Sequence, residues 1–334
     1  MIVTGGAGFI GGHYVEQCIK ESNPTLVIDK LTYAADPVRL EKQCQKGEVE
    51  SLQVDINDSS HVRDAFQTWK PNVVVHFAAE SHVDRSIADA TEFANTNFLG
   101  TLSMLRVSLE YFDSLSKHQQ SDFRFVQIST DEVYGSAGED VAFNEMDLLQ
   151  PGNPYSASKA GADHLVQSFE NTYGLPTLIT RCCNNYGTHQ HCEKLIPLMI
   201  SAAVSNQPLP IYGEGQQVRE WIHVKDHVSA INCIIEHSMS SGEAGQTFNI
   251  GTGQRPNNLE VVQRICSAVD RYCNRHDGTS AKNITFVEDR LGHDFRYALD
   301  SSSLASLGWK PEVALEDGIE KTVQWYCEQL LAET

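Results

Sequence analysis

The segment QISTDEVYGS (127–136) places several polar groups directly behind an apolar run. Residues 125–128 predict a buried strand, and the strand ends at Thr130, Asp131 and Glu132. Two neighbouring carboxylates repel each other, and a cleft that holds them raises the pKa of at least one. Two carboxyl groups in unequal environments can divide the work of a general acid and a general base. The triplet therefore indicates acid–base chemistry, whereas a turn capped by Asp131 would explain only one of its members.

A second pair of reactive side chains, Tyr155 and Lys159, lies in NPYSASKA (153–160). Asn153 can cap a helix here, and Pro154 suits its first turn. Residues four apart share one helix face, and an ammonium beside a phenol lowers the phenol's pKa from about 10. We therefore expect Tyr155 to remove a proton from a hydroxyl group. An ordinary amphipathic helix with a surface lysine has the same spacing. The pair therefore indicates catalysis only in combination with the glycine-rich loop and Thr130.

The third motif is a glycine-rich loop, TGGAGFIG, which follows the first strand-like run. Gly6, Gly8 and Gly11 have the G-x-G-x-x-G spacing, and Gly5 extends it. Glycine permits the tight turn and lets the backbone approach a pyrophosphate at a helix N-terminus. A purely structural glycine turn is the alternative for this loop taken alone.

Acidic residues end the next two strand-like runs. Asp29 follows Gly8 by about 20 residues, where an acid can bind a ribose 2′-hydroxyl. A carboxylate there repels a 2′-phosphate, so NAD is favoured over NADP, although the charge of Lys30 opposes this. Asp55 and Ile56 end the third run, where an adenine edge would lie; a helix cap is an equal alternative for Asp55.

The elements that must position these residues alternate along the first half of the chain. Helix-like patterns, such as 61–69 and 91–112, separate strand-like runs at 2–3, 25–29, 51–55, 72–79, 123–129 and 175–182. Alternation of this kind predicts an α/β fold with a doubly wound parallel Rossmann sheet. After residue 186 the pattern changes to short strands and helices, among them 259–272 and 315–331. We expect a dinucleotide-binding domain at 1–186, with part of the later chain interleaved, and a smaller substrate-binding lobe at 187–334.

Composition narrows the possible partners. The 334 residues carry a net charge of −19, so a nucleic acid or an anionic membrane surface is not expected as a partner. No apolar run is long enough to span a bilayer, and no signal peptide is expected. The nine cysteines show no C-x-x-C spacing, which favours reduced thiols in the cytoplasm. The segment HQHC (189–192) fits no closed zinc site, so no metal is expected.

Beyond these motifs, the chain resembles the extended short-chain dehydrogenase/reductases that act on nucleotide sugars, and most closely the dTDP-glucose 4,6-dehydratase family. The glycine loop and Y-x-x-x-K mark only the superfamily, whereas TDE and DRLGHDFRYA are far more specific. Epimerases of the superfamily usually carry small or hydroxylated residues where Asp131 and Glu132 stand. The resemblance runs from end to end through TGGAGFIG, DKLTYA, FAAESHVDRSI, TNFLGT, STDEVYG, NPYSASKAGADH, RCCNNYG, EKLIP, PLPIYGEGQQVREWIHVKDH, FNIGTG, DRLGHDFRYALD and LGWKPE.

The resemblance implies a reaction in three parts. NAD⁺ takes a hydride from sugar C4 while Tyr155 removes the O4 proton, water is then lost across C5 and C6, and the hydride returns to C6. The product is a 4-keto-6-deoxy sugar, and NAD is regenerated and stays bound. The resemblance assigns Glu132 as the C5 base and Asp131 as the acid, while Thr130 bonds near O4. It also implies a homodimer that pairs two helices, 91–112 and 154–173, from each chain.

The resemblance carries two larger sets of residues onto this sequence. The expected NAD-binding set is Gly5, Gly6, Gly8, Phe9, Ile10, Gly11, Asp29, Lys30, Leu31, Thr32, Asp55, Ile56, Ala78, Ala79, Thr96, Tyr155, Lys159 and Asn185. The expected substrate-binding set is Ser81, Thr130, Asn184, Glu193, Lys194, Leu195, Pro210, Tyr212, Arg219, Asn249, Asp289, Arg290 and His293. Arg219 suits a diphosphate because a guanidinium forks onto phosphate oxygens.

The sequence departs from the family pattern at two positions, and three other functions remain possible. Thr188 and Cys192 stand where the family commonly has proline, which could loosen the loop over the substrate. The alternative enzymes are a UDP-glucose 4,6-dehydratase and a nucleotide-sugar 4-epimerase, and product analysis separates them. A cofactor-binding sensor on the same fold is the non-enzyme alternative, since fold alone does not imply function. A degenerate sensor would be expected to lose some of the reactive residues that are present here.

Overall fold

Seven parallel strands form the central sheet of the computed structural model, which describes residues 1–46, 48–289 and 292–332. The strand order is β10-β6-β5-β4-β1-β2-β3. The predicted doubly wound α/β sheet is therefore confirmed. Its strands are β1 (Ile2–Thr4), β2 (Thr25–Asp29), β3 (Val49–Gln53), β4 (Val73–His76), β5 (Arg124–Thr130), β6 (Thr177–Cys182) and β10 (Gln246–Ile250).

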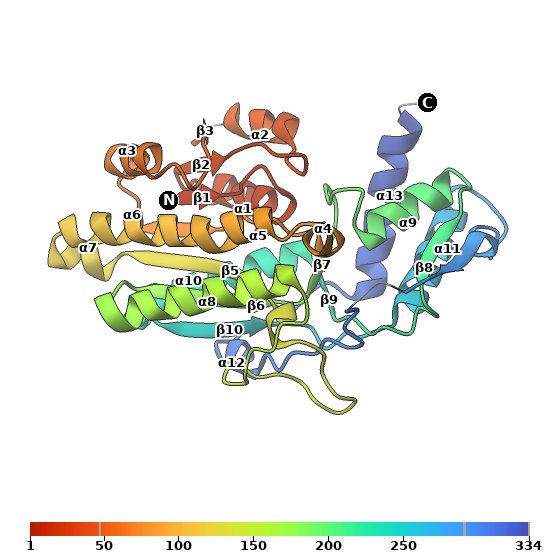
Figure 1. Cartoon of the computed structure of the whole chain (residues 1–334). Coiled ribbons are helices and arrows are strands. Elements are labelled where there is room, and N and C mark those ends of the chain that lie inside the picture. The colour runs from red at the N-terminus through yellow and green to blue at the C-terminus, as the bar shows by residue number, and fades with distance from the viewer. Residues whose placement is uncertain (47, 290–291, 333–334) are drawn as a thin grey trace.

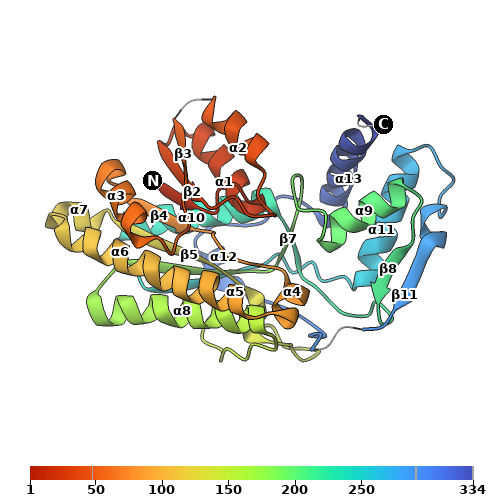
Figure 2. The same ribbon diagram turned by 45° about the horizontal axis from the view of Figure 1, so that its top comes forward.

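Both faces of this sheet are buried, which explains the continuous apolar runs of its strands. On one face, Val3 and Val27 pack against helices α1 (Phe9–Lys20), α2 (Pro37–Cys44) and α10 (Val224–Ser241). On the other face, Ile2 and Phe125 pack against α3 (Ser59–Trp69), α6 (Thr101–Ser114) and α8 (Pro154–Tyr173). Figures 1 and 2 show α6 and α8 running side by side across this second face.

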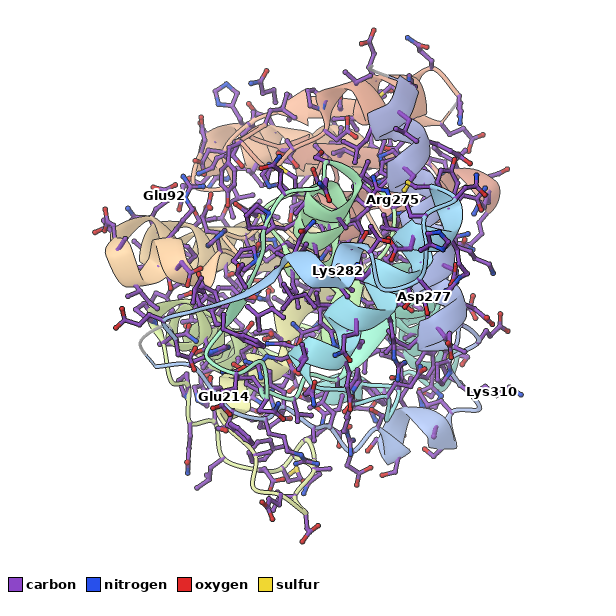
Figure 3. The ribbon with its side chains drawn as sticks, turned by 90° about the vertical axis from the view of Figure 1, so that its right-hand side faces the viewer. Glu92, Glu214, Arg275, Asp277, Lys282 and Lys310 are labelled. Carbon is purple, nitrogen blue, oxygen red and sulfur yellow. The ribbon has the colours of Figure 1, made fainter. Side chains whose placement is uncertain are left out.

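The second half of the chain builds a separate group of elements beside the sheet, at the right of Figure 1. It has its own apolar core and contains α9 (Leu195–Val204), β8 (Leu209–Tyr212), α11 (Asn258–Tyr272), a 3₁₀ turn (Ser280–Asn283), β11 (Ile284–Val287) and α13 (Leu315–Ala332). Arg275, labelled in Figure 3, fixes the end of α11 to α9 by donating to the carbonyls of Ala203 and Val204, at 2.8 Å each. Strands β7 (Asn184–Tyr186) and β9 (Trp221–His223) pair between the two groups.

The helix expected at 91–112 contains a π-helical segment that was not predicted. It consists of α5 (Thr91–Phe93), a π-helix (Ala94–Gly100) and α6 in direct succession. Within the π-helix the Asn97 amide bonds both backbone groups of Glu80, at 2.8 and 3.0 Å, and the Ser158 hydroxyl at 2.9 Å. A polar side chain thus turns inward here, and π-turns of this kind often occur beside functional sites.

The remaining elements are short. They are α4 (Val83–Ala88), α7 (Lys117–Ser121), a 3₁₀ turn (Asp131–Tyr134) and α12 (Ser302–Ser306). Among the helices of the described ranges, none combines the length and the apolar composition needed to cross a lipid bilayer.

Candidate active site

The glycine loop connects β1 to α1 and needs its glycines for space. Gly5 has a φ of +69°, and a Cβ there would lie 2.6 Å from the Ala78 nitrogen. A Cβ at Gly11 would lie 2.3 Å from the Gly5 carbonyl oxygen. Gly8 caps α1 without a side chain, so the first backbone N–H groups of α1 open toward the cleft. This is the arrangement that binds a phosphate at a helix N-terminus.

The acids at the ends of the neighbouring strands lie on the same cleft. Asp29 follows β2 and accepts hydrogen bonds from the backbone N–H groups of Ala7 and Leu31, at 3.0 and 2.8 Å. Burial raises the pKa of this carboxyl above its ordinary value. Lys30 forms ion pairs with Glu92 at 2.9 Å and Asp55 at 3.5 Å. Two carboxylates therefore balance the positive charge of Lys30, so this lysine does less to attract a 2′-phosphate beside Asp29.

The triplet Thr130, Asp131 and Glu132 marks the point where β5 ends and a 3₁₀ turn begins. Thr130 caps this turn: its hydroxyl accepts from the Glu132 N–H at 3.2 Å and donates to Asp131 Oδ1 at 3.3 Å. Asp131 is only 3% exposed, and its Oδ2 has no hydrogen-bond partner among the described residues. Burial raises its pKa well above the usual range, Glu132 and Glu220 raise it further, and Arg219 opposes them. These effects favour the protonated form of Asp131.

Tyr155 enters the cleft from the first turn of α8. The Asn153–Ser156 capping box and a bond from the Tyr155 N–H to Ser86 Oγ, at 3.2 Å, fix this turn. Tyr155 and Thr130 both line the cleft. The sequence thus brings a strand end and a helix start to one point.

The predicted lowering of the Tyr155 pKa is wrong for this structure. Burial raises the pKa of Tyr155 well above 10, the carboxylate of Glu132 adds to the rise, and the bond to Thr130 opposes it. The Lys159 ammonium donates to the Ile128 carbonyl at 2.6 Å, and burial lowers its pKa. The i, i+4 spacing correctly placed both side chains at the cleft, but it could not show that burial dominates the pKa of Tyr155.

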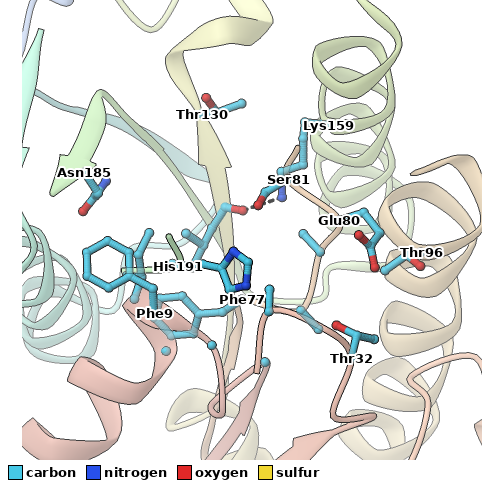
Figure 4. Close-up of a pocket in the computed structure, with 18 of the residues that line it drawn as sticks. Phe9, Thr32, Phe77, Glu80, Ser81, Thr96, Thr130, Lys159, Asn185 and His191 are labelled. Carbon is cyan, nitrogen blue, oxygen red and sulfur yellow. Dashed lines mark hydrogen bonds between the residues drawn. The ribbon is translucent and has the colours of Figure 1, made fainter. Parts of the chain in front are cut away.

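These residues surround one cleft of about 320 Å³. Figure 4 shows Phe9, Thr32, Thr96, Thr130 and Lys159 around a common space. Of the residues expected from the sequence, those that line the cleft are Gly5, Gly8, Phe9, Ile10, Gly11, Asp29, Lys30, Thr32, Asp55, Ile56, Ala78, Ala79, Ser81, Thr96, Thr130, Asp131, Glu132, Tyr155, Lys159, Asn184, Asn185, Glu193 and Lys194.

Several residues of the cleft wall were not predicted to line an active site. Among them are Glu80, Cys182, Gln190 and His191. Glu80 directly follows the apolar run of β4, so its position at a strand end was an available signal. Gln190 and His191 belong to a loop whose place in the fold no local pattern gives.

A second cluster of expected residues lies in the smaller group of elements. Tyr212 ends β8 and packs edge-on against the His293 ring, with 6.2 Å between ring centroids. Asp289 accepts from Gln217 Nε2 at 2.8 Å and lies 2.6 Å from His293 Nδ1. Arg290, expected beside them, lies outside the described residues.

Other expected residues lie outside the cleft wall, namely Gly6, Leu31, Leu195, Pro210, Arg219 and Asn249. Asn249 is fully buried, and its amide donates to the carbonyls of Phe143 and Asp300, at 2.8 and 3.2 Å, so a substrate contact is not supported. Arg219 is 5% exposed; its guanidinium donates to the Asp294 carbonyl at 2.8 Å and lies 4.3 Å from the Tyr297 ring centroid. Its Nη1 also donates to the carbonyls of Val218 and Phe295, and a contact between Arg219 and a diphosphate stays a prediction.

The HQHC segment has other contacts than metal ligation. His189 Nδ1 lies 3.3 Å from Asp36 Oδ2, and the His191 ring packs edge-on against Tyr33. Within the described part of the chain, no three His, Cys, Asp or Glu side chains meet in a group that could hold a metal ion.

Comparisons with known proteins cover nearly the whole chain. A family model described as GDP-mannose 4,6 dehydratase matches residues 2–322. The dTDP-glucose 4,6-dehydratase of Haemophilus influenzae is 45% identical over 98% of this chain and 97% of its own length. That of Salmonella typhimurium is 44% identical over 98% of this chain and 92% of its own length.

Solved structures agree with these relatives. The dTDP-glucose 4,6-dehydratase DesIV of Streptomyces venezuelae, with NAD and TYD bound, superposes with a TM-score of 0.86 at 38% identity, covering 98% of this chain and 96% of its own. A Thermus thermophilus UDP-glucose 4-epimerase in complex with NAD gives a TM-score of 0.84 at 26% identity, covering 98% of both chains. The fold is thus common to dehydratases and epimerases, whereas the higher identities are to dehydratases. The chain belongs to the dTDP-glucose 4,6-dehydratase family of the extended short-chain dehydrogenase/reductases.

Proposed function

We propose that this protein is an NAD-dependent hydro-lyase that converts dTDP-glucose to dTDP-4-keto-6-deoxyglucose. One observation carries the proposal: Asp131 and Glu132 lie together in the cleft that also holds Tyr155 and the glycine loop. Oxidation of a hydroxyl needs only a base and a hydride acceptor, whereas loss of water needs an additional acid and base. The relatives named dTDP-glucose 4,6-dehydratase support this reading.

The cleft fits NAD by its own geometry. The glycine loop leaves no room for a Cβ at Gly11, and the uncapped start of α1 offers N–H donors for a pyrophosphate. Asp29 supplies a carboxylate for a ribose hydroxyl and disfavours a 2′-phosphate. When bound, NAD supplies the acceptor for the hydride of C4 and the donor for C6, so it is recycled in each turnover.

The chain's own residues divide the proton transfers. Tyr155 takes the O4 proton as the phenolate, a form that burial disfavours and that a nearby positive charge would favour, and Thr130 lines the cleft beside it. A C4 ketone acidifies the C5 proton, which Glu132 removes as the base and gives back to C5 when the hydride adds to C6. Asp131 donates to the departing C6 hydroxyl, which agrees with burial having raised its pKa.

Two groups of side chains are available for the nucleotide sugar. Ser81, Asn184, Glu193 and Lys194 line the cleft and suit the hexose. The cluster of Tyr212, Asp289 and His293 lies on the smaller lobe and suits the nucleotide end. A UDP-glucose 4,6-dehydratase is the second candidate, because its chemistry uses the same carboxylates. A 4-epimerase is disfavoured, because it has no use for the acid and the base at 131 and 132.

The test is incubation of the purified protein with dTDP-glucose and, separately, with UDP-glucose. Mass spectrometry should detect a product lighter by one water molecule, formed faster from dTDP-glucose. A product of unchanged mass would instead indicate an epimerase. Faster dehydration of UDP-glucose would favour the second candidate.

We also propose that the protein is a homodimer and that it is located in the cytoplasm. The surface of α6 and α8, which lie side by side on one face of the sheet, is the one through which a homodimer would form. The nine cysteines carry free thiols, which favours a reducing compartment such as the cytoplasm.

A further inference from the structure

The segment Thr188–Lys194, here called the strap, leaves β7 and ends at the start of α9. Four of its residues, Gln190, His191, Glu193 and Lys194, line the cleft together with the glycine loop. Figure 4 shows His191 facing the same space as Phe9. The strap therefore forms part of the wall of the cleft that also holds the glycine loop.

The first half of the strap contacts the dinucleotide-binding side of the molecule. His13 on α1 bonds the Thr188 carbonyl through Nε2 at 2.9 Å. His189 Nδ1 lies 3.3 Å from a carboxylate oxygen of Asp36, the residue that caps α2. His189 has a φ of +62°, so the strap turns sharply at this contact.

The second half of the strap contacts two further loops of that side. The Tyr33 hydroxyl donates to Glu193 Oε1 at 3.3 Å, and the Tyr33 ring packs against His191 with 5.5 Å between centroids. His82 Nε2 lies 3.6 Å from Glu193 Oε2. Lys194 Nζ donates to the Ser81 carbonyl at 2.8 Å.

Helix α13 of the smaller lobe holds the strap from the other side. The Trp325 ring lies 4.6 Å from that of His189, and the Tyr326 hydroxyl donates to the Gln190 carbonyl. The strap is thus tied to both lobes by side chains.

We propose that the strap is a latch that retains NAD in the cleft, and that His189 and Tyr33 are the positioning residues that close it. A dinucleotide on the glycine loop lies in the cleft that the strap helps to enclose, so its release requires the contacts to Asp36 and Glu193 to open. This inference rests on the proposed function, because it takes NAD as the ligand of the cleft. A recycled cofactor benefits from such a latch, since loss between oxidation and reduction would strand the sugar as an intermediate.

The test compares the parent with His189→Asn/Tyr33→Phe. Asparagine tolerates a positive φ, and phenylalanine keeps the ring against His191. Each protein is loaded with radiolabelled NAD and diluted into excess unlabelled NAD, and retained label is followed by rapid filtration. Two lost contacts should speed release about 10-fold. The matched control His61→Asn/Tyr272→Phe changes the same residue types on α3 and α11 and should release NAD at the parent rate.

The outcomes separate the latch from the proposed function. If the double variant retains label as long as the parent does, the latch is refuted while NAD binding stands. If the parent binds no NAD, the proposed function itself fails. Tyr33→Phe alone alters a side chain that is 41% exposed, so folding is preserved, and about 3-fold faster release is expected from it.

Discussion

Glu132 is the residue whose replacement separates oxidation from elimination. Glu132→Gln keeps the shape of the side chain but removes its basic carboxylate, so C4 oxidation should proceed while C5 keeps its proton. We expect the variant to accumulate bound reduced nicotinamide after dTDP-glucose is added, with turnover lowered about 100- to 10,000-fold. Absorbance of the reduced nicotinamide in a stopped-flow instrument measures this directly.

Tyr155→Phe is the matched comparison for that experiment, because it acts one step earlier. Without the phenolic oxygen the C4 hydroxyl keeps its proton, so little reduced nicotinamide should form. The role assignment would be contradicted if Tyr155→Phe accumulated reduced nicotinamide and Glu132→Gln did not.

The ionisation of Asp131 should determine how kcat changes on the alkaline side of the pH profile. Burial raises the pKa of its carboxyl, so Asp131 holds its proton at pH values where an ordinary aspartate is ionised. The acid form is present below the raised pKa and is lost as the pH rises through it, so kcat should fall on the alkaline side. Asp131→Asn should lower kcat about 100-fold or more and remove this limb. An unchanged alkaline limb in the variant would show that another group titrates there.

At the scale of elements, the start of α8 couples stability to the site. The Asn153 side chain accepts from the Ser156 N–H at 2.9 Å and caps the turn that carries Tyr155. Asn153→Ala should lower the free energy of unfolding by about 1 kcal/mol, and kcat should fall as well. Asn257→Ala removes the equivalent capping box of α11 and should cost similar stability with kcat unchanged. Urea denaturation and steady-state kinetics on both variants check this, and equal kcat losses would argue against a positioning role for the α8 cap.

Sequence patterns predict the sheet well because both of its faces are buried. The run 25–29 coincides with β2, and the run 123–129 differs from β5 by one residue at each end. The π-helix within 91–112 was not predictable, because it accompanies a bond between Asn97 and the backbone of Glu80, which lies outside this helix. Local periodicity carries no information on such a contact.

The same limit applies to the site. Strand-end acids and the glycine loop could be read from the sequence, because parallel strands end at one edge of the sheet. The contacts of the strap could not be predicted from the sequence, since His13 and Thr188 lie 175 residues apart in the chain. The raised pKa of Tyr155 could not be predicted either, since it depends on burial and on the carboxylate of Glu132.

At the scale of the whole molecule, the central prediction is a dimer. Helices α6 and α8 lie side by side on one sheet face, and Leu99, just before α6, is 47% exposed. Sedimentation at micromolar concentration should give about twice the chain mass of 37.1 kDa. A species of single chain mass throughout that range would refute the dimer.

The most direct test of the account is the fate of the C4 hydrogen. Purified protein is given dTDP-glucose that carries deuterium at C4, without added NAD, and the product is examined by NMR and mass spectrometry. The product should be a 4-keto-6-deoxy sugar lighter by one water molecule, with the deuterium at C6, because one enclosed cofactor moves the hydride within one sugar. Dehydrated product without deuterium, or sugar of unchanged mass with deuterium still at C4, would contradict it.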